Sequence, residues 1–541
     1  MKYSNIGIIV KRNKLSYFII SFIQGISSLA DLAMQYYLKD ELELEPYEMS
    51  RVIAFVMIPW IIKPLLGLLT DLVPILGYRR KVYLILCGLI GFVSWLFMSI
   101  FADNLMETIV LLTLINLAFS FTSIIGEAIV VELSKMGEKT ADGDFNKNLN
   151  SPNKSFLADK KSTHSEKAKN HVSLFFLFKN VGALLSAFFR GYLMEIMSIR
   201  YIFFINAFIP LFILIAGLIL YEHPNIILVN DKIKTEECIG LEDLHVLNNY
   251  HDYYSITTSF DEKREFLINI HKESMNAKNL EARKISAEFE LNRKELFRNF
   301  YNFILKKEVY IPALFSVALF ATPNFADPFF YYMTNFLKFS PGQLGILSLM
   351  TSFGVLIAIL SYRFFFKNCA FKSLVSGSTL LYFLFTFLAY LLVLRVNLKY
   401  GISDFTFCNF GFIFLSILGE MSMMPILTLA CTICPKNLEA TVYSFYMSAI
   451  NFGLMLSTLN SSFITSWLNL TGKNFDNLGM LIIICNCFKI VPIIILFYID
   501  SRYFEGGKSV HKEEEYTLIK NEHEEFQECV NPNENIKKII I

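Results

Sequence analysis

A few charged residues lie within long stretches of the sequence that are otherwise apolar. They are Lys63, Asp31, Glu127, Asp327 and Glu420. A charge at the centre of a bilayer costs at least about 2.5 kcal/mol, and such residues usually face a bundle interior or a water-filled path. A lysine there can hold an anionic group, and a carboxylate can accept N–H donors or carry a proton. These residue types therefore predict the binding and movement of a charged or dipolar solute.

Lys63 gives the strongest of these signals because Pro64 follows it directly. A proline inside a helix removes one backbone hydrogen bond, frees a carbonyl and bends the helix. A cation beside such a break suits an anionic or dipolar solute, whereas a plain membrane anchor has no use for it. Lys179 is a second lysine within a predicted span.

The surrounding sequence predicts an all-α polytopic membrane protein. Of its 541 residues, 54% are hydrophobic and 18% are charged, below the roughly 25% charged residues of soluble domains. A helix needs about 20 apolar residues to cross a bilayer, and we predict twelve such helices. Their ranges are 16–38, 50–71, 82–101, 107–131, 171–194, 200–221, 309–335, 342–366, 372–394, 404–433, 438–463 and 477–499.

Charge in the short loops orients the chain, because Lys and Arg accumulate on the cytoplasmic side of a membrane. The basic loops place both termini in the cytoplasm. The predicted parts are a cytoplasmic tail (1–15), a six-helix half (16–221) with a cytoplasmic insertion (132–170), a cytoplasmic linker (222–308), a second six-helix half (309–500) and an acidic cytoplasmic tail (501–541). We expect a monomer in a lipid bilayer, in the plasma membrane rather than an organelle membrane.

Several other classes of function have little support in the sequence. The net charge of +1 gives no sign of nucleic-acid binding. All eight histidines lie outside the apolar cores, so a histidine proton relay is not expected. The nine cysteines are scattered, with close pairs at Cys431-x-x-Cys434 and Cys485-x-Cys487. These pairs favour apolar packing over the alternative of a metal or redox site. Phosphate-loop, zinc and nucleophile-elbow motifs are not found, so we expect no enzyme activity, no metal and no cofactor.

The two predicted halves resemble each other at three places. The matches are Ala30-Asp31, Tyr36 and Pro46 with Ala326-Asp327, Tyr331 and Pro341; Gly126-Glu127 with Gly419-Glu420; and Asn180-x-Gly182 with Asn451-x-Gly453. They pair span 1 with 7, 4 with 10 and 5 with 11, as two parallel six-helix repeats of the major facilitator architecture do. Spans 1, 4, 7 and 10 carry the four acids and are expected to line the central path. Alternatively, some of these acids cap helices or pair with Lys63, Lys179 or Arg190.

Longer motifs point to a known family. They are Pro59-Trp60-x-x-Lys63-Pro64-x-x-Gly67-x-x-x-Asp71, Thr322-Pro323 with Asp327, Ser340-Pro341-x-x-Leu344-Gly345, and Cys434-Pro435-x-x-x-Glu439-Ala440-Thr441. In these motifs the chain resembles the folate–biopterin transporter family, a branch of the major facilitator superfamily. The likeness runs through nearly all twelve spans. It departs at span 4, where Gly126-Glu127 replaces the aspartate-rich end expected for that family.

The resemblance implies uptake of folates, pterins or related small molecules, coupled to protons. Lys63 and Lys179 would then meet carboxylates of the solute. Asp31 or Asp327 would accept hydrogen bonds from a pterin ring.

Other residues would complete this site. Phe325 and Tyr331 would offer aromatic stacking surfaces. Glu127 and Glu420 are the candidates for carrying the coupling proton.

A gate is predicted at the cytoplasmic ends of the spans. Asp71 would pair there with Arg79 and Arg80, holding the two halves together until they rock apart. Glu132 and Glu439 would join this network. Anchoring of the topology by positive charge is the simpler alternative, but it explains the arginines and not Asp71.

Two other functions stay open at this point. S-adenosylmethionine is an alternative solute, because it combines an aromatic base, an amino acid and a positive sulfonium. A membrane receptor or scaffold that transports nothing is an alternative of another class. It would keep the buried carboxylates at a stability cost without a flux to serve.

Overall fold

The computed structural model describes residues 2–145, 175, 177–222, 298, 301–433 and 439–504. Most of them are helical, and no strand occurs in these ranges. Three predicted parts lie largely outside the described residues. They are the rest of the insertion (146–170), most of the linker (223–297) and most of the acidic tail (505–541).

The first half is built from short and long helices in succession. They are α1 (Lys2–Ile26), η1 (Ser27–Ala30), α2 (Asp31–Tyr36), η2 (Tyr37–Glu41), α3 (Pro46–Val56), α4 (Ile58–Ile61), α5 (Lys63–Leu72), α6 (Lys81–Ile100), α7 (Leu105–Phe145), a helical segment at 177–196, α9 (Ile199–Ala207) and α10 (Ile209–Ile219).

The second half repeats this pattern. Its helices are α14 (Lys307–Phe320), α15 (Ala326–Tyr331), η3 (Tyr332–Phe336), α16 (Pro341–Ser361), η4 (Tyr362–Phe366), α17 (Phe371–Val393), α18 (Val396–Lys399), α19 (Asp404–Ile433), α20 (Glu439–Trp467), α21 (Leu478–Phe488), α22 (Ile490–Tyr498) and η5 (Ser501–Phe504).

Helices occupy all twelve predicted spans. Within the described residues, eight are long and apolar enough to cross a membrane by length and composition alone. The other four spans are interrupted or more polar: α3 to α5, the segment 177–196, α14 to η3, and α20. Helix α7 is longer than predicted, because it continues from 131 to Phe145. This extension is polar and includes two Glu and two Lys, which favour helix outside a membrane as well.

The internal repeat is present in the backbone. Helices α2 and α15 each have six residues, and each is followed by a five-residue π-helix. Each corner then turns through one residue with positive φ, Glu43 at 52° and Lys338 at 57°. The next helix begins with a capping box and with the proline that the repeat pairs, Pro46 or Pro341.

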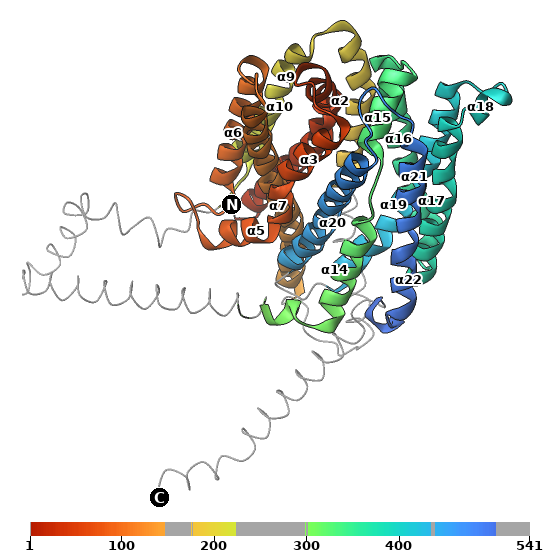
Figure 1. The fold of residues 1–541 in the computed structure, drawn as a ribbon. Helices are drawn as coiled ribbons and strands as arrows, with labels where there is room; N and C mark the ends of the chain where they lie inside the picture. Colours follow the sequence, from red (N-terminus) through yellow and green to blue (C-terminus); the bar gives the residue numbers. More distant parts are fainter. Residues whose placement is uncertain are drawn as a thin grey trace, which may run out of the picture.

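The two halves lie side by side, and α20 of the second half packs along α3, α4 and α5 of the first (Figure 1). We call the end with residues 42–46, 337–340 and 469–476 the distal end, and the end with residues 77–81, 222 and 499 the proximal end. Hydrogen bonds between the described parts of the halves gather at the distal end. There Glu45 Oε2 accepts from the Gly472 amide at 2.6 Å, and Arg51 Nε donates to Ser462 Oγ at 3.1 Å.

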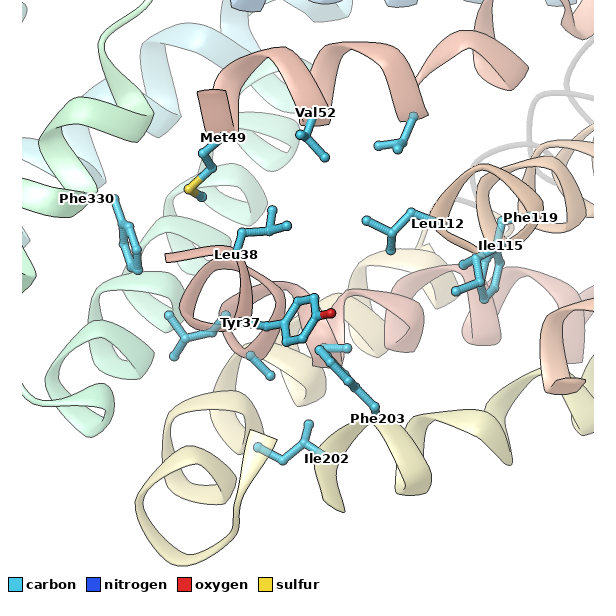
Figure 2. Close-up of a cluster of buried hydrophobic side chains, with 14 of the residues drawn as sticks. Tyr37, Leu38, Met49, Val52, Leu112, Ile115, Phe119, Ile202, Phe203 and Phe330 are labelled. Carbon is cyan, nitrogen blue, oxygen red and sulfur yellow. The ribbon is translucent and has the colours of Figure 1, made fainter. Parts of the chain in front are cut away.

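The apolar core also joins the halves at the distal end. Tyr37 packs on Phe203 with ring centroids 5.5 Å apart, within the cluster of buried side chains in Figure 2. Phe330 of the second half belongs to this cluster and meets Tyr36 edge to face at 5.5 Å. Aromatic pairs of this geometry add to the stability gained by burial. The distal ends of the halves are therefore held together by apolar and polar contacts.

Candidate functional site

Lys63 stands at a break in the second span. Helix α4 ends at Ile61, and α5 begins at Lys63. Ser120 Oγ donates to the Pro59 carbonyl at 2.8 Å. Pro64 has no N–H for the carbonyl of Trp60, which accepts instead from Asn451 Nδ2 of the second half at 3.3 Å. The freed carbonyl that the sequence predicted is thus bonded across the two halves.

The Lys63 ammonium is buried in an ionic cluster. The residue is 1% exposed, and its Nζ lies 3.2 Å from Glu127 Oε1 and 3.0 Å from Ser123 Oγ. Ser123 also donates to Glu127 at 2.9 Å. The ring of Trp60 lies 5.4 Å from Nζ and adds a cation–π contact. Lys63 and Glu127, predicted for separate roles, therefore neutralise each other here.

Lys179 and Glu420 bring charge from both halves to the same region. Lys179 lies on the helical segment 177–196 and is half-buried, and its charge interacts with those of Lys63, Glu127 and Glu420. Glu420 lies on α19 of the second half and interacts with Lys179. Lys63 and Glu127 thus form an ion pair, and Lys179 and Glu420 lie within electrostatic range. We call these four residues of spans 2, 4, 5 and 10 the central ionic group.

Asp31 lies in a different setting at the first corner. Its side chain is 63% exposed, and its Oδ2 is 4.0 Å from Nη2 of Arg190. Arg190 is 15% exposed and donates to Ser28 Oγ at 3.0 Å. Ser28 and Ser186 hydroxyls are 2.8 Å apart. The carboxylate of Asp31 is therefore accessible and has a cation beside it.

Asp327, the repeat partner of Asp31, is 7% exposed and takes part in the contact between the halves. Its Oδ2 accepts a hydrogen bond from Ser50 Oγ of α3 at 2.5 Å. Tyr331 is 2% exposed, and its hydroxyl donates to the Leu44 carbonyl of the first half. Phe325 is half-buried beside Phe329, with ring centroids 5.7 Å apart. The structure thus brings Asp327 and Tyr331 of span 7 to the interface between the halves.

The predicted gate lies at the proximal end. The backbone amides of Arg79 and Arg80 donate to the Glu222 carboxylate at 2.9 and 3.0 Å. This anchors the basic turn to its own half. The side chains of Asp71, Glu132 and Glu439 lie outside the described part of the structure, so their pairing remains a prediction.

Two contributors were not found by sequence reasoning. Ser123 lies one helical turn before Glu127, a spacing that could have indicated a shared contact. The signal for Ser50 was weaker, and it is a departure from the repeat. Gly345 stands at the same distance after Pro341 as Ser50 does after Pro46.

Solved structures with the same fold are transporters of several kinds. The nucleoside transporter NupG aligns with a TM-score of 0.57 and 14% identity, over 90% of this chain and 100% of that one. The xylose transporter XylE from E. coli aligns with a TM-score of 0.54 and 12% identity, over 90% and 96% of the two chains. The chain thus has the major facilitator fold and is an integral multi-pass membrane protein.

Sequence comparison gives the family. The model of the BT1 family matches residues 24–146 and 153–515, so the chain belongs to that family. It is 30% identical to Folate transporter 1 of Plasmodium falciparum, over 90% of this chain and 80% of the relative. It is 28% identical to the Folate-biopterin transporter of Synechocystis sp., over 88% and 79%. The protein is a membrane transporter of small molecules and not an enzyme.

Proposed function

We propose that this chain moves folates, pterins or related small solutes across a membrane by alternating access, coupled to protons. The central ionic group is the observation that carries the proposal. The group consists of Lys63, Glu127 and Lys179 of the first half and Glu420 of the second. The names of the similar proteins supply the class of solute. A folate carries a flat heteroaromatic ring and carboxylates, for which lysines are suitable partners.

The pairing of Lys63 with Glu127 supports the proposed coupling to protons. The Glu127 carboxylate occupies the position beside Lys63 that a carboxylate of the solute would take. A proton on Glu127 would leave Lys63 without a counter-charge in a buried setting, which is unfavourable. A solute carboxylate would restore the balance, so the proton and the anionic solute would bind together. Glu420 would serve Lys179 in the same way from the second half.

Span 7 and the proximal turn complete the proposed cycle. Asp327 and Tyr331 close the distal end in this structure. Asp71 with Arg79 and Arg80, joined by Glu132 and Glu439, would close the proximal end in the alternate state. Phe325 would be one wall of the path for the solute ring.

Uptake of radiolabelled folic acid into proteoliposomes with an imposed pH gradient tests this proposal. The wild-type protein is expected to show saturable uptake that increases with the gradient. Glu127→Gln keeps the side-chain shape and removes the charge, so uptake should lose its dependence on the gradient. Glu107→Gln, an exposed glutamate near the distal end, is the matched control and should behave as wild type.

The contrary outcome is equally clear. If wild-type vesicles match empty ones, folic acid is not the cargo, and biopterin and S-adenosylmethionine are tried next. Failure of all three in folded protein would overturn the proposed solute classes.

A further inference from the structure

The two repeat-related aspartates differ in whether their carboxylates can accept hydrogen bonds from a ligand. Asp327 is 7% exposed and already receives the Ser50 hydroxyl at 2.5 Å. The Asp31 side chain is 63% exposed, and its nearest cation is 4.0 Å away. Its carboxylate therefore has oxygen lone pairs available for a ligand in this state of the protein.

Arg190 fixes the surroundings of Asp31. Its Nη2 is held by Ser28 at 3.0 Å and lies 3.5 Å from Ser186. Its Nε is buried and has no hydrogen-bond partner among the described residues. The guanidinium thus supplies positive charge beside Asp31 without closing a bidentate pair with it, which leaves the carboxylate open towards the other side.

An open carboxylate selects a particular ligand chemistry. Its two oxygens accept two parallel N–H donors, the arrangement that makes paired charge-assisted hydrogen bonds strong. The 2-aminopyrimidinone edge of a pterin presents such a pair, in its ring N–H and its adjacent amino group. A sugar hydroxyl or a simple carboxylic acid presents no such pair.

Lys179 offers a second anchor for such a ligand and lies on the same helical segment, 177–196, as Arg190. Lys179, Ser186 and Arg190 are spaced by seven and four residues, which places them on one helix face. Lys179 and Arg190 are about 16 Å apart along the helix axis. A molecule with paired N–H donors at one end and a carboxylate at the other could contact Asp31 and Lys179 together.

We propose that Asp31, with Arg190 beside it, binds the aminopyrimidinone edge of a pterin ring, while the anionic tail of a folate points towards Lys179. This rests on the proposed function and adds the residue that selects the ring and the direction in which the solute lies. Asp327 serves as a contact between the halves and not as the ring ligand in this state.

Binding to the purified full-length protein tests the assignment. Radiolabelled folic acid is displaced by biopterin, which has the ring alone, or by p-aminobenzoylglutamate, which has the tail alone. Asp31→Asn should weaken displacement by biopterin about tenfold or more and leave the tail fragment unchanged. Lys179→Met should weaken displacement by p-aminobenzoylglutamate and leave displacement by biopterin unchanged. Asp103→Asn, an 81% exposed aspartate paired with Arg200, is the matched control and should change neither.

A second test changes the ligand and begins with the wild-type protein. A folate analogue with a methyl in place of the 2-amino group should bind the wild-type protein about tenfold or more weakly than folic acid. The Asp31→Asn protein should discriminate less between the two. Equal binding of both compounds by wild type would overturn the assignment, as would an equal loss of ring and tail fragments in Asp31→Asn.

The two levels of proposal can fail separately. If the purified protein binds biopterin through Asp31 but vesicles transport nothing, the proposed transport fails and the ring site stands. If transport succeeds and Asp31→Asn keeps full selectivity for the ring, the ring site fails alone. If wild type binds neither folic acid nor biopterin, both proposals are overturned.

Discussion

The corner after Asp31 and the corner after Asp327 share one backbone but place their aspartates in different surroundings. Both contain a six-residue helix, a π-helix, a residue with positive φ and a proline-started helix. Asp31 is exposed beside Arg190, whereas Asp327 is buried against Ser50. Local sequence patterns are enough to set the backbone. The environment of each acid is set by residues that lie far away in the sequence.

Single departures from the repeat account for the difference. Gly345 stands at the spacing of Ser50 and carries no hydroxyl, and Ser461 stands at the spacing of Arg190 and carries no charge. The same holds for the buried lysine. Ala358 takes the spacing of Lys63 after the proline and is fully buried. The cations of these sites, Lys63, Lys179 and Arg190, therefore come from the first half, while the acids come from both halves.

The largest effect is expected from Lys63→Met. Removing one partner of a buried ion pair costs about 3–5 kcal/mol, because the other charge is left uncompensated. Thermal unfolding of the purified protein in detergent should show this loss. Lys63→Met combined with Glu127→Met should recover most of the stability but not the transport. Arg502→Met is the control, because it removes an 84% exposed cation paired with Asp500, and it should leave the unfolding temperature nearly unchanged. An unchanged stability in Lys63→Met would contradict the buried pair.

Gly345→Ala should weaken the closure of the distal end. A Cβ at Gly345 would meet the backbone of Gly191 in the other half, which can yield only if the helices separate. Overpacking of this kind costs about 1–3 kcal/mol. The yield of disulfide cross-links between Glu43→Cys and Lys473→Cys, introduced into an otherwise cysteine-free chain, should therefore be lower in the Gly345→Ala variant. Gly377→Ala is the matched control, since nothing lies within 4 Å of its added Cβ. Undiminished cross-linking would show that the contact does not limit closure.

Ser50→Ala should have a smaller effect in the same direction. It leaves Asp327 without its 2.5 Å hydrogen bond, and an unsatisfied buried group costs about 1–3 kcal/mol. Cross-linking between Glu43→Cys and Lys473→Cys should fall moderately. Ser21→Ala removes a buried hydroxyl that, among the described residues, bonds only to a carbonyl of its own helix, and it should leave cross-linking unchanged. If both variants behave alike, Ser50 has no special part in closing the interface.

The two capping boxes should give the smallest effects and can be compared directly. Ser340→Ala removes one cap together with the 3.2 Å hydrogen bond from its hydroxyl to Glu195 Oε1 of the first half, and should cost about 1 kcal/mol in thermal unfolding. Glu45→Ala removes the other cap together with the shorter 2.6 Å contact to the Gly472 amide, so its cost should be larger. A greater loss in Ser340→Ala would mean that the Glu45 contact between halves contributes little.

The sequence predicted the twelve helical ranges and the repeat because both follow from local composition. Hydropathy locates the spans, and Asp, Tyr and Pro at matching spacings locate the corners. The partners of the charged residues could not be predicted in the same way. Glu127 could have paired with Lys63, Lys179 or Arg190, and only the packing of spans 2 and 4 decides in favour of Lys63. The end of α7 was missed because hydropathy reports the edge of a bilayer and not the end of a helix.

The close contact of Gly191 with Gly345 has one more consequence. Here two helices from opposite halves touch backbone to backbone, with no side chain between them. At the glycine pair itself, a turn of one half against the other would require no side chain to move. The energy barrier to such a turn would then be set by the ionic and apolar contacts around the glycine pair. The pair itself would be a point of rotation with a low energy cost.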